Sequence, residues 1–279
     1  MPFLNTWKLE KSRDRLRYAM HGLIHGKRIR TYWWGSRKNF GDLITPALLL
    51  AYGYTPVYEK KHRAELLCTG SILDGVNEHF SGQVLGSGLI RDHQIRLPKA
   101  QFLAVRGELT RERLGLDTGL PLGDPGLLAD RLLAGPVAKR YRLGVVPHYA
   151  DMQNAGVHTL LQSLGDSARL INPEDYPVAV IRQIAACEQV VSSSLHGIIV
   201  AHALGIPAVW MRLSESVAGG GFKFHDYASS VGLRLEPIEL QPGISLADLT
   251  AMACQPDAGL LTRRKTELDR LFSSRVGGE

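Results

Sequence analysis

The feature that most constrains the fold of this sequence is a repeated alternation between short apolar runs and helix-like segments. Each apolar run has the length of a strand, and most end in glycine or polar residues, as buried strands do. The strand-like runs are residues 28–34, 64–70, 82–88, 101–107, 141–149, 168–174, 188–194 and 206–212. The helix-like segments are residues 45–53, 108–115, 154–164, 178–187 and 196–205. This alternation predicts an α/β fold in which helices cover both faces of parallel sheets.

The alternation breaks once, in the segment RLLAGPVAKR, where Gly135 and Pro136 interrupt the pattern. It restarts with the strand-like run that begins at residue 141. We therefore predict two Rossmann-like domains that face a cleft. The predicted units are an N-terminal helix, two α/β domains and a C-terminal helix, at residues 1–27, 28–135, 136–255 and 256–279.

The first helix-like segment, TPALLLAYG, carries boundary signals at both of its ends. Thr45 suits the N-cap, Pro46 suits the first helical position and Gly53 suits the end of a helix. These signals predict a short helix over residues 45–53.

The N-terminal segment carries an excess of positive charge. The whole chain has 33 Lys and Arg against 27 Asp and Glu, a net charge of +6 that favours an anionic partner. Residues 7–30 alone hold eight Lys or Arg against Glu10 and Asp14. Apolar side chains fall there at roughly helical spacing: Trp7, Leu16, Met20, Leu23 and Ile24. A basic amphipathic helix of this kind either lies on an anionic membrane surface or packs on the domain by one face.

Composition and missing motifs argue against several classes of protein. Hydrophobic residues make up 44% of the chain, yet no uncharged apolar run of about 18 residues predicts a transmembrane helix. The N-terminus lacks the pattern of a secretory signal. Cys68, Cys187 and Cys254 have no metal-type spacing, so we expect a reduced, cytoplasmic protein without a bound metal. The chain has no nucleic-acid-binding motif, P-loop, GxGxxG or HExxH, and we expect neither a nucleic-acid partner nor a cofactor.

The stretch VVSSSLHGIIVAHALGIPAVW, residues 190–210, places polar residues where a buried strand gives way to a helix. In parallel sheets, ligands bind beyond the carboxyl ends of strands, and helix N-termini there attract phosphate or carboxylate groups. Ser192, Ser193 and Ser194 suit such a site, and Gly197 allows a close approach of the backbone. His196 can exchange protons near neutral pH. This junction therefore predicts an anion site that carries a proton-transfer group.

Other strand ends have the same character. Asn39 and Asp42 follow the first strand-like run, and an Asx-type turn is the alternative interpretation for them. Arg106 ends the strand-like run at residues 101–107, and Arg212 ends the run at residues 206–212 in the same way. An arginine at such a position can bind carboxylate or phosphate with two nitrogens. His202, by contrast, follows in an apolar setting and predicts a core histidine.

Together these motifs resemble the polysaccharide pyruvyl transferase family. NFGDLITPALL is similar to its N-terminal Asn-x-Gly-Asp motif, and LLCTGSI and VLGSGLI to its two glycine-rich strand ends. AVRGELTRERL followed by GDPGLLAD resembles its Val-Arg and Asp-Pro segments. VVSSSLHGIIVAHALGIPAV resembles its most diagnostic motif, and GFKFHDYASSVG its lysine-containing segment. The resemblance covers roughly residues 30 to 235.

The resemblance implies a GT-B-like pair of Rossmann domains and transfer of the pyruvyl group of phosphoenolpyruvate to a sugar, commonly as a cyclic ketal. It implies acceptors among exopolysaccharides and other cell-surface glycans. We expect the acceptor to be a polyprenyl-diphosphate-linked precursor. The protein would then be cytoplasmic, with peripheral contact to the inner face of the membrane.

This chemistry needs anion clamps, a general acid and a base. His196 is the predicted proton shuttle and Asp42 the predicted base, with His148 as its alternative. The predicted donor-binding residues are Arg106, Ser192, Ser193, Ser194, Gly197, Arg212 and Lys223. The predicted acceptor-binding residues are Asn39, His148 and His225. The resemblance points most firmly to His196 and Arg106.

One departure from the family pattern concerns Ser194. Many members carry arginine at this position, two residues before the motif histidine. We expect Arg212 to grip the donor in its place. Two alternatives stay open: a glycosyltransferase of the same architecture that uses a sugar nucleotide, and a non-catalytic glycan-binding relative, which Ser194 supports slightly.

Overall fold

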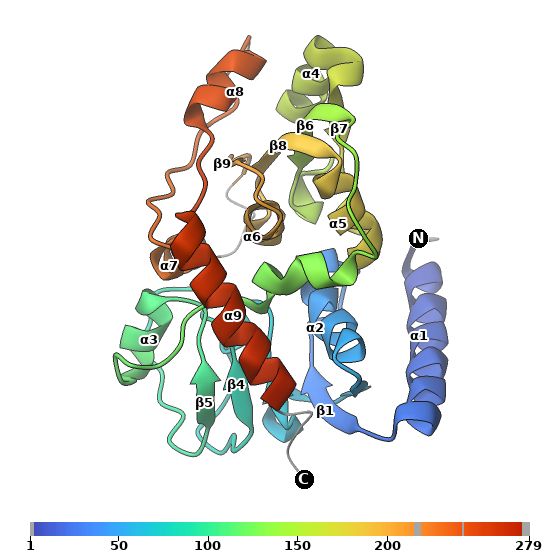
Figure 1. Ribbon diagram of the computed structural model, residues 1–279, viewed down its shortest axis with the longest axis vertical. Coiled ribbons are helices and arrows are strands. Elements are labelled where there is room, and N and C mark those ends of the chain that lie inside the picture. Colours follow the sequence, from blue (N-terminus) through green and yellow to red (C-terminus); the bar gives the residue numbers. More distant parts are fainter. Residues whose placement is uncertain (1–2, 215–218, 242, 275–279) are drawn as a thin grey trace.

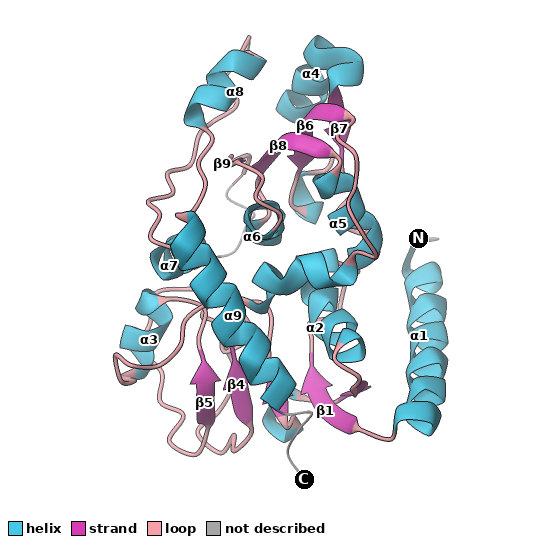
Figure 2. Ribbon diagram, in the orientation of Figure 1, coloured by secondary structure: helices cyan, strands magenta, loops and turns pink. Residues whose placement is uncertain are grey.

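Two parallel sheets carry the alternating segments (Figure 2). The computed structural model describes residues 3–214, 219–241 and 243–274. The first sheet has the order β2-β1-β3-β4-β5, all pairs parallel. Its strands are β1 (Arg28–Tyr32), β2 (Thr55–Tyr58), β3 (Leu66–Leu67), β4 (Gln83–Leu85) and β5 (Gln101–Ala104). The helices of this half are α1 (Phe3–His25), α2 (Phe40–Ala51) and α3 (Glu108–Leu114).

The second half repeats this strand order in a smaller sheet, β7-β6-β8-β9, again with parallel pairs. Its strands are β6 (Tyr141–Val146), β7 (Ala168–Leu170), β8 (Cys187–Ser192) and β9 (Ala208–Trp210). The helices are α4 (Ala155–Leu164), α5 (Pro177–Ala185), α6 (Leu195–Ala203), α7 (Phe222–Ser230), α8 (Leu246–Met252) and α9 (Ala258–Ser274). Short 3₁₀ helices are η1 (Lys61–Arg63), η2 (Pro125–Leu132), η3 (Tyr149–Asp151) and η4 (Gly165–Ser167).

A helical layer joins the two halves. Elements α2, η2 and α6 lie between the sheets in Figure 1, and Phe40, Leu128 and Ile198 from these elements belong to one buried apolar cluster. Helix α9 returns to the first half, where Phe272 stacks on Tyr52 with ring centres 5.0 Å apart. The predicted α/β class with parallel sheets is thus confirmed. The division into two domains around a GT-B-like cleft stays a prediction.

Helix α2 begins earlier than its boundary signals predict. Asn39 rather than Thr45 is the N-cap, and its side-chain oxygen accepts a hydrogen bond from the Gly41 N–H at 3.1 Å. Pro46 lies inside the helix instead of at its first position. The predicted boundary at residue 45 is therefore wrong. The earlier start brings Phe40 into the helix, where its side chain is completely buried.

The sequence pattern does not predict β2, because its run is short and contains Pro56. Proline lacks the backbone N–H that a central strand needs, but an edge strand tolerates it. Strand β2 lies at the edge of the first sheet, where Pro56 pairs with Ile29. The predicted end of α3 is confirmed: Gly115 follows the helix with a φ of 65°, in the left-handed region that favours glycine.

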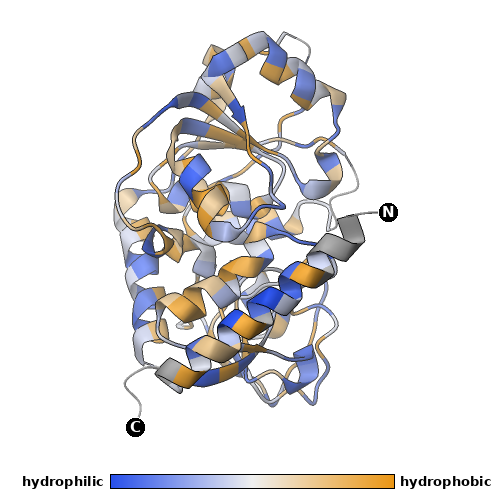
Figure 3. Cartoon of the chain, turned by 90° about the vertical axis from the view of Figure 1, so that its right-hand side faces the viewer, coloured by the Kyte–Doolittle hydropathy of each residue, from blue (hydrophilic) through white to orange (hydrophobic). Residues whose placement is uncertain are grey.

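Helix α1 lies along the edge of the first sheet (Figures 1 and 3), and it faces that sheet with Trp7, which is buried. Leu16, Met20 and Leu23 are exposed on the opposite side. Trp7 and Leu16 are nine residues apart, so at about 100° per residue they lie on opposite sides of the helix. These apolar residues therefore do not share one face. The side chain of Ile24 lies outside the described residues. Among the described residues, no helix combines the length and apolar character needed to cross a bilayer.

Candidate active site

Strand ends from both sheets meet in one place between the halves. In a doubly wound sheet of this order, ligands bind where the order reverses, between the first and third strands. Here that point lies between β1 and β3 in one sheet and between β6 and β8 in the other. The segments that follow these four strands carry Asn39, Asp42, Gly70, His148 and His196.

His196 lies in the first turn of α6 and reaches into the first half of the molecule. Only 8% of the residue is exposed. A Cβ atom at Gly41 would lie 2.2 Å from His196 Nδ1, and one at Gly70 would lie 3.9 Å from Cε1. Because no side chain fits at position 41, glycine allows the imidazole to rest directly against α2. The ring is therefore enclosed by segments from both sheets.

Asp124 faces the other nitrogen of this ring. Its Oδ2 lies 3.7 Å from His196 Nε2, and its side chain is completely buried. Its Oδ1 accepts a hydrogen bond from the Gly126 N–H at 2.8 Å, which caps η2. Neither Asp124 Oδ2 nor His196 Nε2 has a hydrogen-bond partner among the described residues. The two atoms are within ion-pair distance if the ring is protonated, and a small movement of either side chain would bring them within hydrogen-bond distance.

Asp42 lies near His196 in the first turn of α2. Burial of its carboxyl group raises its pKa to about 6, although the charges of His196 and Lys223 and a hydrogen bond from Asn39 act in the opposite direction. A carboxylate whose pKa approaches neutrality can accept a proton from a hydroxyl more readily than an ordinary aspartate. Asn39 thus contributes both the helix cap and a hydrogen bond to this carboxyl group.

Lys223, in α7, brings a positive charge to the same region. Burial lowers its pKa to about 8, the charge of Arg106 lowers it as well, and Asp42 raises it. Burial also lowers the pKa of His148 to about 4, with a smaller effect from Lys223. His148 is therefore neutral near pH 7. These mutual effects place the predicted base, a lysine and a neutral histidine within electrostatic reach of one another.

Arg106 is completely buried and bonds to protein groups. Its Nε donates to Asp226 Oδ2 at 2.8 Å, Nη1 to Ser71 Oγ at 2.5 Å, and Nη2 to the Leu89 carbonyl at 2.5 Å. Asp226 belongs to α7, so this ion pair ties the helix that carries Lys223 to the first sheet. Donor binding by Arg106 stays a prediction, and a donor would have to take up the remaining N–H groups or displace one of these bonds.

Two of the three serines hold the loops beneath α6. Ser192 Oγ lies 2.7 Å from the Val146 carbonyl and accepts a hydrogen bond from the Ser194 N–H at 3.0 Å. Ser193 Oγ donates to Asp151 Oδ2 at 2.9 Å and accepts from the His148 N–H at 2.8 Å. Ser194 is the N-cap of α6, but its side chain makes no capping bond. Of the three hydroxyls, that of Ser194 is therefore the one without a role in holding this loop.

The remaining predicted residues lie around this centre. A Cβ atom at Gly197 would lie 2.2 Å from Ser192 Oγ, so glycine there allows α6 to pack on β8. Arg212 and His225 line a recess of about 250 Å³ together with Ser193, and Arg212 pairs with Glu239 at 3.0 Å. Donor binding by Arg212 and acceptor binding by His225 stay predictions.

His202 is a core histidine, as predicted. Its ring nitrogens lie 3.0 Å from the Tyr227 hydroxyl and 3.1 Å from the Cys254 carbonyl. Burial lowers its pKa to about 4. A histidine that is completely buried, with partners at both nitrogens, contributes to packing rather than to the site at His196.

The family model for polysaccharide pyruvyl transferase matches residues 70–215, which is more than half of the chain. The chain belongs to the polysaccharide pyruvyl transferase family. The matched region of this family member contains Arg106, Asp124, His148, the three serines and His196. Asn39, Asp42, Lys223 and His225 lie outside the match.

Two curated proteins are similar to this family member. An uncharacterized protein of Acanthamoeba polyphaga mimivirus is 31% identical over 218 residues, which cover 71% of this chain and 73% of that protein. The succinoglycan biosynthesis protein ExoV of Rhizobium meliloti (strain 1021) is 29% identical over 218 residues, covering 74% of this chain and 66% of ExoV. A solved structure, a functionally uncharacterized protein of Klebsiella pneumoniae subsp. pneumoniae, is 13% identical. It covers 82% of this chain and 98% of its own, with a TM-score of 0.43 that is too low to support an argument.

Sequence reasoning missed Asp124 as a site residue. The motif GDPG marks it only as an aspartate before proline at the start of a helical turn, a frequent capping position. Nothing local indicates that its second oxygen faces His196, which lies 72 residues further along the chain. In this family member the contact exists because α6 packs against η2.

Proposed function

We propose that this protein transfers the pyruvyl group of phosphoenolpyruvate to a sugar of an exopolysaccharide or other cell-surface glycan, forming a pyruvate ketal. Membership of the polysaccharide pyruvyl transferase family supports pyruvyl transfer. Similarity to ExoV, a succinoglycan biosynthesis protein, supports a role in polysaccharide biosynthesis. The structural observation that carries the proposal is the buried pair of Asp124 and His196 beside Asp42.

The reaction needs a proton at one carbon and loses protons from two hydroxyl groups. Protonated His196 would give its proton to the methylene carbon of phosphoenolpyruvate, which makes the neighbouring C2 electrophilic. A sugar hydroxyl then bonds to C2 and its proton passes to Asp42. The C2–O bond to phosphate breaks and a second hydroxyl bonds to C2, which closes the ketal. The proton of this second hydroxyl passes to the departing phosphate, which leaves as inorganic phosphate. The buried carboxylate of Asp124 would stabilise the imidazolium form of His196 before the first step.

Anion binding would come from groups already close to His196. Phosphoenolpyruvate carries a phosphate and a carboxylate, and the first turn of α6 presents backbone N–H groups to such a ligand. Ser194 has a hydroxyl that makes no capping bond, and Lys223 contributes a positive charge. We propose that these groups hold the donor, and that Arg106 acts by fixing the helix that carries Lys223.

The direct test is release of inorganic phosphate from phosphoenolpyruvate in the presence of a panel of β-galactosides, glucosides and mannosides. We expect release that depends on both the donor and a particular pyranoside. Phosphoenolpyruvate should also raise the melting temperature of the protein, whereas UDP-sugars should not. Stabilisation by a UDP-sugar instead would favour the glycosyltransferase alternative. Binding of neither donor would favour a non-catalytic relative.

The pH dependence of kcat/KM should be bell-shaped. As a base, Asp42 must lose its proton, so activity rises as the pH passes its pKa of about 6. As a cation, Lys223 must keep its proton, so activity falls as the pH passes about 8. Initial rates measured across this range test the prediction.

A matched variant assigns the alkaline limb. Lys223→Arg should move that limb to higher pH, because a guanidinium stays protonated. His148 is neutral throughout this range and should contribute neither limb. A flat profile between pH 5 and 9 would contradict the assignment of both groups, and an alkaline limb unchanged in Lys223→Arg would contradict the assignment of that limb to Lys223.

We further propose that the acceptor is carried on a polyprenyl diphosphate and that the reaction takes place at the inner face of the cell membrane. The support for this is the basic N-terminal segment, because a helix of this kind binds anionic membrane surfaces. Phosphate release with a lipid-linked oligosaccharide should exceed release with the same oligosaccharide free in solution. Equal rates would contradict a lipid-linked acceptor.

A further inference from the structure

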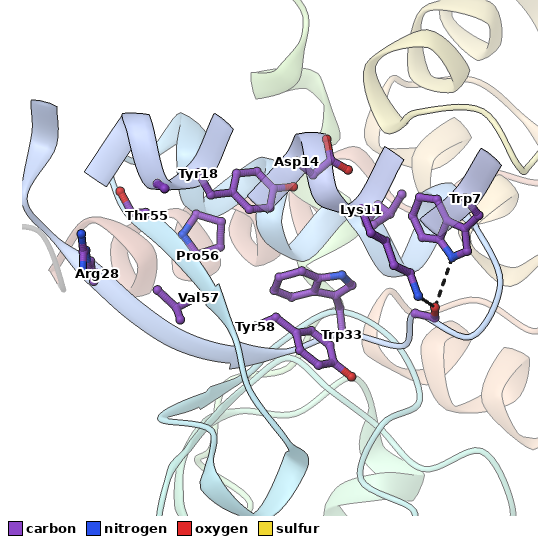
Figure 4. A pocket seen from close by; sticks show the side chains of 13 residues that line it. Trp7, Lys11, Asp14, Tyr18, Arg28, Trp33, Thr55, Pro56, Val57 and Tyr58 are labelled. Carbon is purple, nitrogen blue, oxygen red and sulfur yellow. Dashed lines mark hydrogen bonds between the residues drawn. The ribbon is translucent and has the colours of Figure 1, made fainter. Parts of the chain in front are cut away.

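Helix α1 is attached to the molecule through one of its faces. The side chain of Trp7 is buried and its Nε1 donates to the Gly35 carbonyl at 3.2 Å, an acceptor that Lys11 shares (Figure 4). The Tyr18 ring meets Trp33 edge-on, with ring centres 6.4 Å apart. These contacts leave a cavity of about 430 Å³ between α1 and the strands β1 and β2. The helix is thus held by scattered contacts rather than by a continuous apolar seam.

The apolar side chains of α1 lie on its opposite face. Leu9 is 66% exposed, Leu16 64%, Met20 57% and Leu23 82%. At about 100° per residue these four side chains fall within an arc of about 60°, and the stripe is about 21 Å long. Four large apolar side chains in one row contribute nothing to the core, so the row needs another explanation.

Exposed basic side chains of α1 flank the apolar stripe. Arg13 and Arg17 are exposed beside the apolar stripe, and Lys27 and Arg28 are exposed just beyond the helix. Arg13 and Arg17 share a recess with Glu10, Asp14 and Tyr176, where Glu10 pairs with Lys38 at 2.7 Å and Asp14 accepts a hydrogen bond from Tyr176. The apolar stripe and the exposed arginines beside it consist of Leu9, Arg13, Leu16, Arg17, Met20 and Leu23.

We infer that this outward face of α1 binds the surface of an anionic lipid bilayer, with the leucine stripe in the interface and the arginines at the phosphate groups. A helix with an apolar stripe and basic flanks binds such a surface in the plane of the membrane. A second copy of the chain fits less well. A stripe one helix wide is small for a stable dimer, and a symmetric contact would bring like charges together.

Membrane binding by α1 is a different property from pyruvyl transfer, but one segment of the chain connects α1 to the candidate site. The segment from Trp33 to Asn39 joins the contacts of α1 to the start of α2, where Asp42 lies. Docking of α1 would therefore bring one side of the site towards the bilayer that holds a lipid-linked glycan. Vesicle binding needs no donor or acceptor, so it can be measured whether or not the transfer proposal holds.

The test is co-sedimentation of the full chain with vesicles of phosphatidylcholine, alone or mixed equally with phosphatidylglycerol. We expect binding to the mixed vesicles that weakens as salt rises, and little binding to phosphatidylcholine alone. Leu16→Asp and Leu23→Asp should each weaken binding by about tenfold or more. Met252→Asp is the matched control, because Met252 is 50% exposed on α8, far from α1 (Figure 1), and it should bind like the wild type.

The charges are tested in the same way. Arg13→Gln and Arg17→Gln should each weaken binding by about fivefold, whereas Arg234→Gln, an exposed arginine elsewhere, should not. Equal binding by the stripe variants and the Met252 control would overturn the inference. So would a dimer, detected by light scattering without lipid, that Leu16→Asp converts to a monomer. Phosphate release with a soluble pyranoside should be unchanged in all these variants, which separates failure of docking from failure of transfer.

Discussion

Replacing His196 by alanine should slow phosphate release from phosphoenolpyruvate by a factor of about 100 or more. The ring is enclosed by Gly41, Gly70 and Asp124, and the variant removes the group that we propose protonates the methylene carbon. The proposed donor grip, at Lys223 and the start of α6, stays intact in this variant. We therefore expect the loss in kcat, with a small change in KM for phosphoenolpyruvate. Near-normal turnover would contradict the role of His196.

Asp124→Asn tests whether the buried carboxylate acts through the histidine. Asparagine keeps the shape of the side chain, and its oxygen can still accept the hydrogen bond from Gly126. Its amide N–H₂ group would then face His196 Nε2, where it disfavours a protonated ring. We expect kcat to fall by roughly 10- to 100-fold and KM to change little, because a positioning residue does not touch the donor.

A double-mutant cycle separates this role from simple loss of stability. If Asp124 acts through His196, the Asp124→Asn change should add no further loss to His196→Ala. Asp130→Asn is the matched control, since Asp130 lies in the same 3₁₀ helix but is exposed and pairs with Lys265. That control should keep the wild-type rate. Independent, multiplying effects in the double variant would show that Asp124 has a separate role.

The sequence predicts the repeating part of this fold well, because that part depends on local patterns. Strand β8 and helix α6 follow from an apolar run, a polar junction and a second apolar segment within residues 188–205. The start of α2 is predicted less well, since Thr45 followed by Pro46 looks like the start of a helix, although both lie inside a helix capped by Asn39. Strand β2 is short and contains Pro56, which hides it from any pattern of strands.

The strand pattern predicts site residues that lie near strand ends, and the family resemblance adds Lys223. His196 and Asp42 occupy such positions, and the structure brings them together. The contact between Asp124 and His196 depends on packing between distant segments, which no local pattern contains. Arg106 is a second case in which the sequence alone does not reveal a residue's contacts. A strand-end arginine looks the same in the sequence whether it binds a ligand or a buried aspartate 120 residues away.

Arg106→Gln is therefore expected to affect stability more directly than donor binding. The change leaves Asp226 completely buried without its ion-pair partner, which costs about 3–5 kcal/mol in the free energy of unfolding. Asp226→Asn should cost a comparable amount, because it leaves the buried guanidinium unpaired. Urea unfolding curves of both variants measure these losses. Arg234→Gln is the control, since it removes an exposed ion pair and should change stability little.

The two possible roles of Arg106 predict opposite results in kinetics and stability. If Arg106 holds α7, both Arg106→Gln and Asp226→Asn should destabilise the protein, and both should weaken the donor grip of Lys223 because its helix loosens. If Arg106 instead binds phosphoenolpyruvate, Arg106→Gln should raise KM strongly at near-normal stability, while Asp226→Asn should leave KM unchanged. Asp226 also accepts hydrogen bonds from the backbone N–H and hydroxyl group of Thr110. These bonds attach α7 to α3 through the same carboxylate. We therefore expect that Arg106 holds α7, and that both variants destabilise the protein.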